Sequence, residues 1–290
     1  MAGIAGADEM TKIPEAIGTS ACWQSAFAPV PLRYRGVWRR TLLQTVQHTD
    51  TATIVFWLQT ANWHADLRIP AQRPDFSGVA SVAACNVLQM AFLAGQQGFA
   101  GATEVTASAQ GEICAWHRLI DLQPPATGPD AGRMAFTAEH LIETGLHARY
   151  LEHWVHEPAS AAGSVVLQRL QDRLMDCPDT VAAAALPVEL LLVAGEHVMH
   201  VRDRAAAWPS GTPPDATLAQ MPPDLLIPLL DVEIALGHRT ASGWHIDHAT
   251  HPWLEGTDVG LTCDRTGQDH ASLTIDGVAS RWQVLEWCAR

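Results

Sequence analysis

Three polar side chains share one face of a short predicted strand. Polar and apolar residues alternate along His64–Pro70, which places His64, Asp66 and Arg68 on the same side. A carboxylate and a guanidinium two residues apart can pair, and a paired charge can be buried where an isolated one cannot. On a face turned into the protein, Arg68 would hold Asp66 ionised and could orient an oxygen atom of a ligand. A face turned to water is the common alternative for a barrel strand and stays open.

A second polar group follows on the predicted strand Tyr150–Glu157. One face of this strand carries Tyr150, Glu152, Trp154 and His156. A carboxyl group and an imidazole beside an indole can perform acid–base chemistry, because burial against aromatic rings moves their pKa values toward neutrality. The opposite face is almost as polar, so the alternation does not decide which face is buried, and a solvated edge strand is an equal alternative.

Together the two strands predict one interior site. We expect Asp66, Arg68, Glu152 and His156 to be its catalytic residues and to converge on a cavity, where Glu152 or His156 moves a proton. The chain has 11 tryptophans, which offer walls for an apolar or aromatic ligand. The residues expected to contact the ligand are Trp57, Gln59, His64, Trp116, Tyr150 and Trp154.

The 14 histidines raise the question of a metal or haem site. Several are three residues apart, such as His153 and His156, and on a strand such residues point to opposite faces and cannot chelate one ion together. The sequence has no His-Glu-x-x-His motif and no Cys-x-x-Cys motif, so we expect neither a metal nor a cofactor. A barrel that ligates haem through one histidine is a weaker alternative. The motifs of serine hydrolases and of nucleotide-binding proteins are also absent.

The scaffold for these residues is predicted to be mainly β. Runs of β-branched and aromatic residues, separated by turn residues, indicate roughly ten to twelve short strands. A helix is expected over Ser81–Gly95, which is apolar nearly all round and ends at a glycine, and the alanine run Val181–Leu186 indicates a helical turn. Strands do not alternate with helices, so the pattern favours an antiparallel barrel, or two barrels, with one or two short helices.

The chain divides at two places in this reading. Residues 1–30 are interpreted as an N-terminal arm, and residues 31–290 as the barrel domain. The proline-rich link at 209–223 joins two strand-rich stretches and is the best candidate for a subdivision of that domain.

The opening strand carries a short motif of a known superfamily. Gly36–Arg39 reads Gly-Val-Trp-Arg, and this resembles the Gly-x-Trp opening strand of lipocalins and their calycin relatives. The resemblance implies a closed barrel in which an arginine of the last strand, here Arg281, packs over Trp38. The chain is longer than one lipocalin barrel, so the resemblance is to longer members with extra strands or two barrels. Such members include carotenoid hydratases and pericyclase-type cyclases, which implies either a binding protein or an enzyme.

Composition limits the partners. The net charge of −13 opposes binding to nucleic acids or to an anionic membrane surface, and no apolar run is long enough to span a membrane. Six cysteines without metal-site spacing read as free thiols, and the N-terminus lacks the apolar core of a signal peptide. We therefore expect a soluble cytoplasmic protein, and the sequence leaves a homodimer open.

The sequence thus predicts a lipocalin-like barrel that binds a small, mainly apolar molecule in an interior cavity. Conversion of that molecule by cofactor-free acid–base chemistry, as in a hydratase, lyase or isomerase, is the leading hypothesis. A carrier without catalysis is the first alternative. A structural or interaction protein whose barrel is filled by its own side chains is the second.

Overall fold

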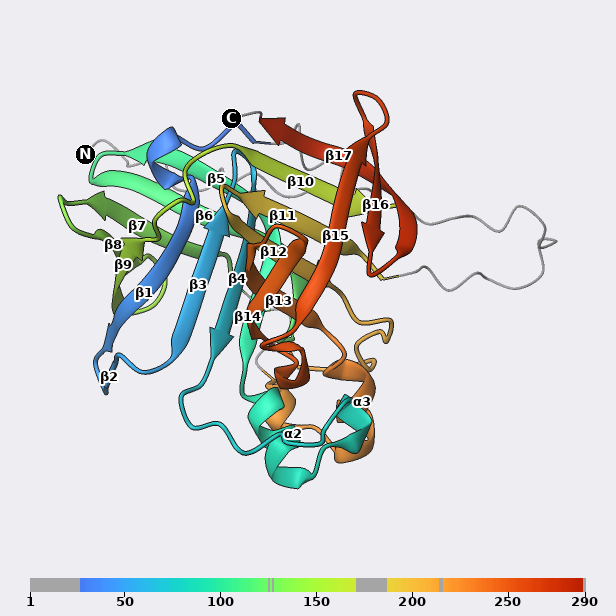
Figure 1. Ribbon diagram of the computed structural model, residues 1–290. Coiled ribbons are helices and arrows are strands. Elements are labelled where there is room, and N and C mark those ends of the chain that lie inside the picture. The colour runs from blue at the N-terminus through green and yellow to red at the C-terminus, as the bar shows by residue number, and fades with distance from the viewer. Residues whose placement is uncertain (1–26, 125, 127, 171–186, 214–215, 289–290) are drawn as a thin grey trace.

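The chain folds into two closed antiparallel β-barrels that follow one another in sequence (Figure 1). The computed structural model describes residues 27–124, 126, 128–170, 187–213 and 216–288. The predicted mainly β fold is therefore confirmed. Most of the expected N-terminal arm and the whole of the alanine run at 181–186 lie outside the described residues.

The first barrel is built from the N-terminal half. Its order is β2-β1-β3-β4-β5-β6-β7-β8-β9, and pairing of β1 with β9 closes it. The register shifts between Arg40 and Leu42, where β1 meets β9. The strands are β1 (Gly36–Thr45), β2 (Thr49–Asp50), β3 (Ile54–Gln59), β4 (Trp63–Ile69), β5 (Gln97–Ser108), β6 (Gly111–Asp121), β7 (Asp130–Phe136), β8 (Leu141–Gly145) and β9 (Tyr150–His156).

The second barrel is a continuous meander closed by pairing of its first and last strands. Four strands were not predicted from sequence: β2 and β5 in the first barrel, and β11 and β15 here. The strands are β10 (Ser164–Arg169), β11 (Glu189–Ala194), β12 (His197–Arg202), β13 (Glu233–Arg239), β14 (Gly243–Ala249), β15 (Asp258–Arg265), β16 (His270–Ile275) and β17 (Val278–Cys288).

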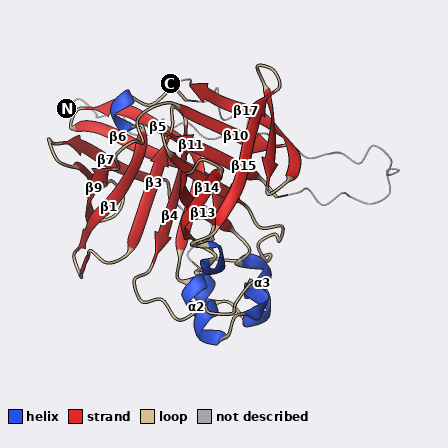
Figure 2. Cartoon of the chain, in the orientation of Figure 1, coloured by secondary structure: helices blue, strands red, loops and turns tan. Residues whose placement is uncertain are grey.

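Helices are short and gather at one end of the molecule, where α2 (Val87–Ala94) contacts α3 (Pro223–Leu229) (Figure 2). The helix expected over Ser81–Gly95 is a 3-10 turn, Val82–Ala84, followed by α2. The break occurs because Asn86 caps α2: its side chain accepts from the Gln89 backbone N–H, and the Gln89 side chain accepts from the Asn86 N–H. Two further 3-10 turns, Leu218–Gln220 and Pro252–Leu254, lie in the second barrel, and another, Leu32–Tyr34, precedes β1.

The change from one barrel to the next falls between β9 and β10. The expected subdivision at 209–223 instead connects β12 to β13, which are neighbouring strands of the second barrel. The proline-rich stretch is a long connection within one barrel. A stretch of this composition can join two paired strands as well as two domains, so it does not by itself identify a domain boundary.

The closure implied by the lipocalin resemblance is wrong. Trp38 lies on β1 of the first barrel, whereas Arg281 lies on β17 of the second and pairs with Ser272. Each barrel closes on its own strands, so the first and last strands do not pair with each other. Trp38 packs instead against the rings of His156, Trp57 and Phe136.

The barrels share an apolar core between them. Among the outward side chains of β3 and β4, Leu58 and Leu67 are fully buried against the second barrel. Leu190 and Leu192 of β11, and Ile234 of β13, supply the opposite side of this core. Strands β3 and β11, and strands β4 and β13, are in contact across it. Burial of this face fixes which residues of β3 and β4 point into the first barrel.

One carboxylate ties the two barrels together. Glu286 of β17 is buried and accepts hydrogen bonds from Thr60 Oγ1 at 2.9 Å and from the backbone N–H groups of Ala61 and Asn62 at 3.0 and 3.2 Å. These donors form the turn between β3 and β4. Ser164 Oγ, from β10, donates to the same carboxylate at 2.6 Å. The turn of the first barrel is thereby fixed to the closing strands of the second.

We predict that Glu286→Ala lowers the free energy of unfolding by about 3 kcal/mol, because it strands several buried donors that now bond to a charged acceptor. Urea unfolding followed by tryptophan fluorescence measures the change. Glu139→Ala, at an exposed carboxylate, is the matched control and should stay within about 0.5 kcal/mol of the parent protein. A Glu286→Ala protein as stable as this control would contradict the role of the carboxylate.

Candidate functional site

The interior of the first barrel contains a cavity of about 250 Å³. This is just below the range of about 300–1,000 Å³ that is usual for small-molecule sites. Aromatic walls and charged groups alternate around it, contributed by seven strands. The lining residues are Leu43, Thr45, Trp57, Asp66, Arg68, Phe99, Trp116, Arg118, Asp130, Glu143, Tyr150, Glu152 and Trp154.

One side of the cavity is partly exposed to solvent, and the other side is buried. Arg68, Arg118 and Asp130 keep 24%, 30% and 28% of their side-chain surface exposed. Trp57 and Trp154 are fully buried. A molecule entering past the charged groups would therefore meet indole rings in the interior.

Most residues predicted to form the site line this cavity. Of the expected catalytic residues, Asp66, Arg68 and Glu152 lie on its wall. Of the expected ligand contacts, four do so: Trp57, Trp116, Tyr150 and Trp154. Two β-strands far apart in sequence, β4 and β9, thus contribute to one interior surface. Their catalytic roles remain predictions.

His156 does not line the cavity, contrary to expectation. Its ring packs edge-on against Trp38 at 4.8 Å, and its Nε2 lies 3.2 Å from the backbone oxygen of Arg35. The alternation correctly placed His156 on the same face as Glu152. His156 is, however, four residues further along β9, at the end of the strand and away from the cavity. A proton donor in the cavity must be sought elsewhere.

Gln59 and His64 point into the barrel interior but do not line the cavity. Thr103 Oγ1 donates to Gln59 Oε1 at 2.7 Å and lies 3.0 Å from His64 Nδ1. Gln59 Oε1 also accepts from Trp57 Nε1 at 3.1 Å. Burial lowers the pKa of His64 well below its usual value, so the imidazole is neutral at pH 7. This network supports the Trp57 wall from behind.

Asp66 and Arg68 form the predicted ion pair. Arg68 Nε donates to Asp66 Oδ1 at 2.7 Å, and Arg68 Nη2 donates to Oδ2 at 3.3 Å. The guanidinium also lies 5.4 Å from the centre of the Phe99 ring. The pair carries both charges into the barrel without leaving either one isolated.

Arg118 forms a second charged group that was not predicted. It donates to Asp121 at 2.7 Å and to Asp130 at 2.5 Å, and its guanidinium lies 3.7 Å from the centre of the Phe99 ring. Arg118 stands two residues after Trp116 on β6. Strand alternation puts Arg118 on the same face as Trp116, so this signal could have found it.

Glu152 is held by a buried arginine. Arg40 Nη1 donates to Glu152 Oε1 at 2.6 Å, and Arg40 Nη2 donates to Asp50 at 2.9 Å. The side chains of Arg40 and Glu152 are only 5% and 4% exposed. Glu152 is therefore a carboxylate paired with a fixed cation.

Glu143 is the acid–base candidate that sequence reasoning missed. It lies directly opposite Glu152 on the neighbouring strand β8. Tyr150 Oη donates to Glu143 Oε1 at 2.7 Å, and Trp154 Nε1 donates to Oε2 at 3.2 Å. Burial, and then the charge of Glu152, raise the pKa of Glu143 well above its usual value. The cavity therefore contains two neighbouring carboxyl groups, of which Glu143 holds its proton more readily than a free glutamic acid.

Space for Glu143 is provided by a glycine. A Cβ atom at Gly132 of β7 would lie 2.6 Å from Glu143 Cγ. Local sequence around Glu143, Leu-Ile-Glu-Thr-Gly, resembles an ordinary amphipathic strand. The burial of Glu143 depends on the position of β8 in the barrel and cannot be read from this local sequence.

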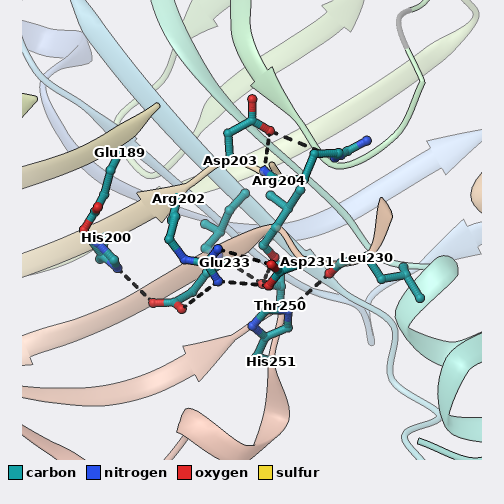
Figure 3. Close-up of polar contacts among 12 residues, drawn as sticks. Glu189, His200, Arg202, Asp203, Arg204, Leu230, Asp231, Glu233, Thr250 and His251 are labelled. Carbon is teal, nitrogen blue, oxygen red and sulfur yellow. Dashed lines mark hydrogen bonds and ion pairs between the residues drawn. The ribbon is translucent and has the colours of Figure 1, made fainter. Parts of the chain in front are cut away.

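The second barrel holds a separate buried cluster of charges (Figure 3). His200 lies between two carboxylates: its Nδ1 is 2.9 Å from Glu233 and its Nε2 is 3.0 Å from Glu189. Burial opposes protonation, but the hydrogen bonds to Glu189 and Glu233 outweigh it and raise the pKa of His200 to about 9. The imidazolium is thus already satisfied on both nitrogens. This cluster is built to hold a charge in place, since neither nitrogen is free to exchange a proton with a ligand.

Arginines extend this cluster toward the first barrel. Arg202 pairs with Asp231 at 3.0 Å. Arg204 donates to the backbone oxygens of Asp121 and Leu122, at the end of β6, at 2.5 and 2.8 Å. Arg204 therefore links the second barrel to the strand that carries Arg118.

Within the described residues, no three His, Cys, Asp or Glu side chains are grouped so that they could hold a metal ion. In the same part of the chain, no helix has the length and apolar character needed to cross a membrane.

Comparison with known proteins supports the fold alone. No protein-family model and no curated protein matches the chain. The crystal structure of an uncharacterized protein of Saccharomyces cerevisiae, YLR301w, is similar, with a TM-score of 0.51 and 12% identity over 87% of this chain and 98% of that chain. The lipocalin resemblance is therefore supported only as far as the barrel architecture.

We predict that Asp66→Ala destabilises the protein by about 3 kcal/mol, because it leaves Arg68 without its counter-charge in a largely buried position. Chemical unfolding measures the change. In the double variant Asp66→Ala/Arg68→Leu, most of the loss should be recovered, since no unpaired charge remains. A single variant within about 1 kcal/mol of the parent protein would show that the pair is solvated rather than buried.

The charged cluster of the second barrel predicts a loss of stability at alkaline pH. The pKa of His200 is raised from 6.5 to about 9, so its stabilising contribution is complete below pH 6.5 and disappears as the pH rises through 9. The difference in unfolding free energy between the parent protein and His200→Gln should shrink by about 3 kcal/mol across this interval. Urea titrations at several pH values test this. His238→Gln, at an exposed ion pair, is the control and should show a change of at most about 1 kcal/mol.

Proposed function

We propose that the protein binds a small molecule in the cavity of the first barrel. The observation that carries the proposal is the cavity of about 250 Å³ enclosed by charged and aromatic side chains of seven strands. Closed barrels of eight strands are just wide enough either to be filled by their own side chains or to hold one small ligand. The ligand would place a mainly apolar body against the indole rings and a polar group beside the charged residues.

The second barrel does not compete for this role. Trp244 and Trp282 point into its core together with aliphatic side chains, and both indole rings are almost completely buried. Its charged cluster at His200 is internally paired. A core packed in this way serves to support the first barrel through their shared interface.

Acid–base conversion of the bound molecule is a second candidate function. The observation in its favour is the direct opposition of Glu143 and Glu152 on β8 and β9, with different partners. Arg40 donates to Glu152, whereas burial and the neighbouring charge raise the pKa of Glu143. Two carboxyl groups in such different surroundings are suited to give and accept a proton without a cofactor. In this proposal Glu143 replaces His156 as the acid.

A pair of tryptophan substitutions on β1 tests binding. Leu43 lines the cavity, whereas its neighbour Leu42 does not. We expect native mass spectrometry of the purified protein to detect a bound small molecule, and Leu43→Trp to abolish this binding by filling the cavity. Leu42→Trp adds the same bulk outside the cavity and should retain the bound molecule. Equal occupancy in both variants would rule out the cavity as the binding site.

Proton transfer is tested on the molecule so identified. The ligand is incubated with the protein in deuterium oxide, and exchange of its carbon-bound hydrogens is followed by NMR. We expect the parent protein to speed up this exchange by a factor of about 100 or more over the buffer, and Glu143→Gln to lose that effect while still binding. Binding without any acceleration in the parent protein would identify a carrier.

A further inference from the structure

The walls of the cavity have a geometry that favours a particular class of ligand. Trp57 lies 5.5 Å from Trp116 and 5.9 Å from Trp154, measured between ring centroids. The interplanar angles are 78° and 74°, so both partners stand nearly perpendicular to Trp57. Indole rings set nearly at right angles present the negative faces of their π-systems in more than one direction. Proteins use such arrangements of aromatic rings to bind organic cations.

The charged groups around the cavity also favour a cation, because carboxyl groups are in excess. Arg40, Arg68 and Arg118 are each already paired with carboxylates. Arg40 bonds to both Glu152 and Asp50, and Arg118 bonds to two aspartates. Glu143 adds a further carboxyl group that no arginine contacts in the described structure. The carboxyl groups therefore outnumber the guanidinium groups in this interior.

We infer that the cavity takes a compact organic cation, with an ammonium or amidinium group beside Glu143 and Glu152 and an apolar body against Trp57, Trp116 and Trp154. This inference rests on the proposed binding function and names its ligand class. An anionic ligand would add a negative charge to an interior that already has an excess of carboxyl groups. The net charge of −13 for the whole chain also favours the approach of a cation from solution.

Glu143 is the group that would respond to such a ligand. Without a cation, burial and the charges of Glu152 and Asp130, opposed by Arg68, raise its pKa and favour its protonated form. Its two oxygens already accept hydrogen bonds from Tyr150 and Trp154, so the ionised form would be well supported. A cation bound beside it removes the reason for protonation. The O–H bond of Glu143 then breaks, its electron pair stays on the carboxylate, and the proton is released to the solvent.

The test uses ligands of one shape and three charges. Benzylammonium, benzyl alcohol and benzoate are titrated into the full-length protein at pH 7 and constant ionic strength by isothermal titration calorimetry. We expect benzylammonium to bind about tenfold or more tightly than benzyl alcohol, and benzoate to bind most weakly. Titrations in two buffers of different ionisation enthalpy should show release of up to one proton per benzylammonium, and none for benzyl alcohol.

Variants identify the group responsible. Glu143→Gln should lose the proton release and most of the preference for the cation, while keeping its affinity for benzyl alcohol. Glu104→Gln makes the same charge change at a partly exposed glutamate that pairs with His117, and it should behave as the parent protein. Tyr150→Phe provides a second variant: it removes one donor to the ionised carboxylate and should reduce both the preference and the proton release.

Three results would overturn the inference. Benzoate could bind as tightly as benzylammonium, the preference could survive in Glu143→Gln, or none of the three probes could bind. Each of these leaves the proposed binding function standing as long as Leu43→Trp, but not Leu42→Trp, removes a bound molecule. Failure of that comparison would instead remove the binding function itself.

Discussion

The outer face of the β3–β4 hairpin is buried between the two barrels, and this burial dictates the character of the first barrel's interior. Leu58 and Leu67 are completely removed from water by the second barrel. Side chains alternate along a strand, so the residues directly before and after Leu58 and Leu67 on their strands must point into the first barrel. Asp66 and Arg68 are therefore inside because their apolar neighbours are held outside by another barrel, and Glu286 fixes the turn that connects the two strands.

An interior forced to accept charged residues has to satisfy them locally. Arg68 does so with Asp66, Arg40 with Glu152, and Arg118 with Asp130. Such pairs stabilise a fold little compared with apolar packing, because desolvation offsets most of their attraction. Their retention in the first barrel is consistent with a function for the cavity that they surround. Glu143 is the exception, because no guanidinium among the described residues contacts it.

The two barrels solve the same packing problem in different ways. The second barrel fills its core with Trp244, Trp282 and aliphatic side chains, and its buried histidine is bound by carboxylates on both nitrogens. The first barrel places its tryptophans around a space. Arg204 reaches from the second barrel to the end of β6, the strand that carries Arg118. The second barrel thus acts as the rigid base on which the cavity walls are positioned.

The sequence by itself determined the mainly β fold, the pairing of Asp66 with Arg68, and the shared faces of β4 and β9, because these depend on local alternation and on residue type. It did not determine which face of each strand was buried, since both faces of β9 are similarly polar. It also could not find Glu143 or reject the closure through Arg281. Those features depend on which strands become neighbours, and pairing between residues far apart in sequence is decided by the packing of whole barrels rather than by any local pattern.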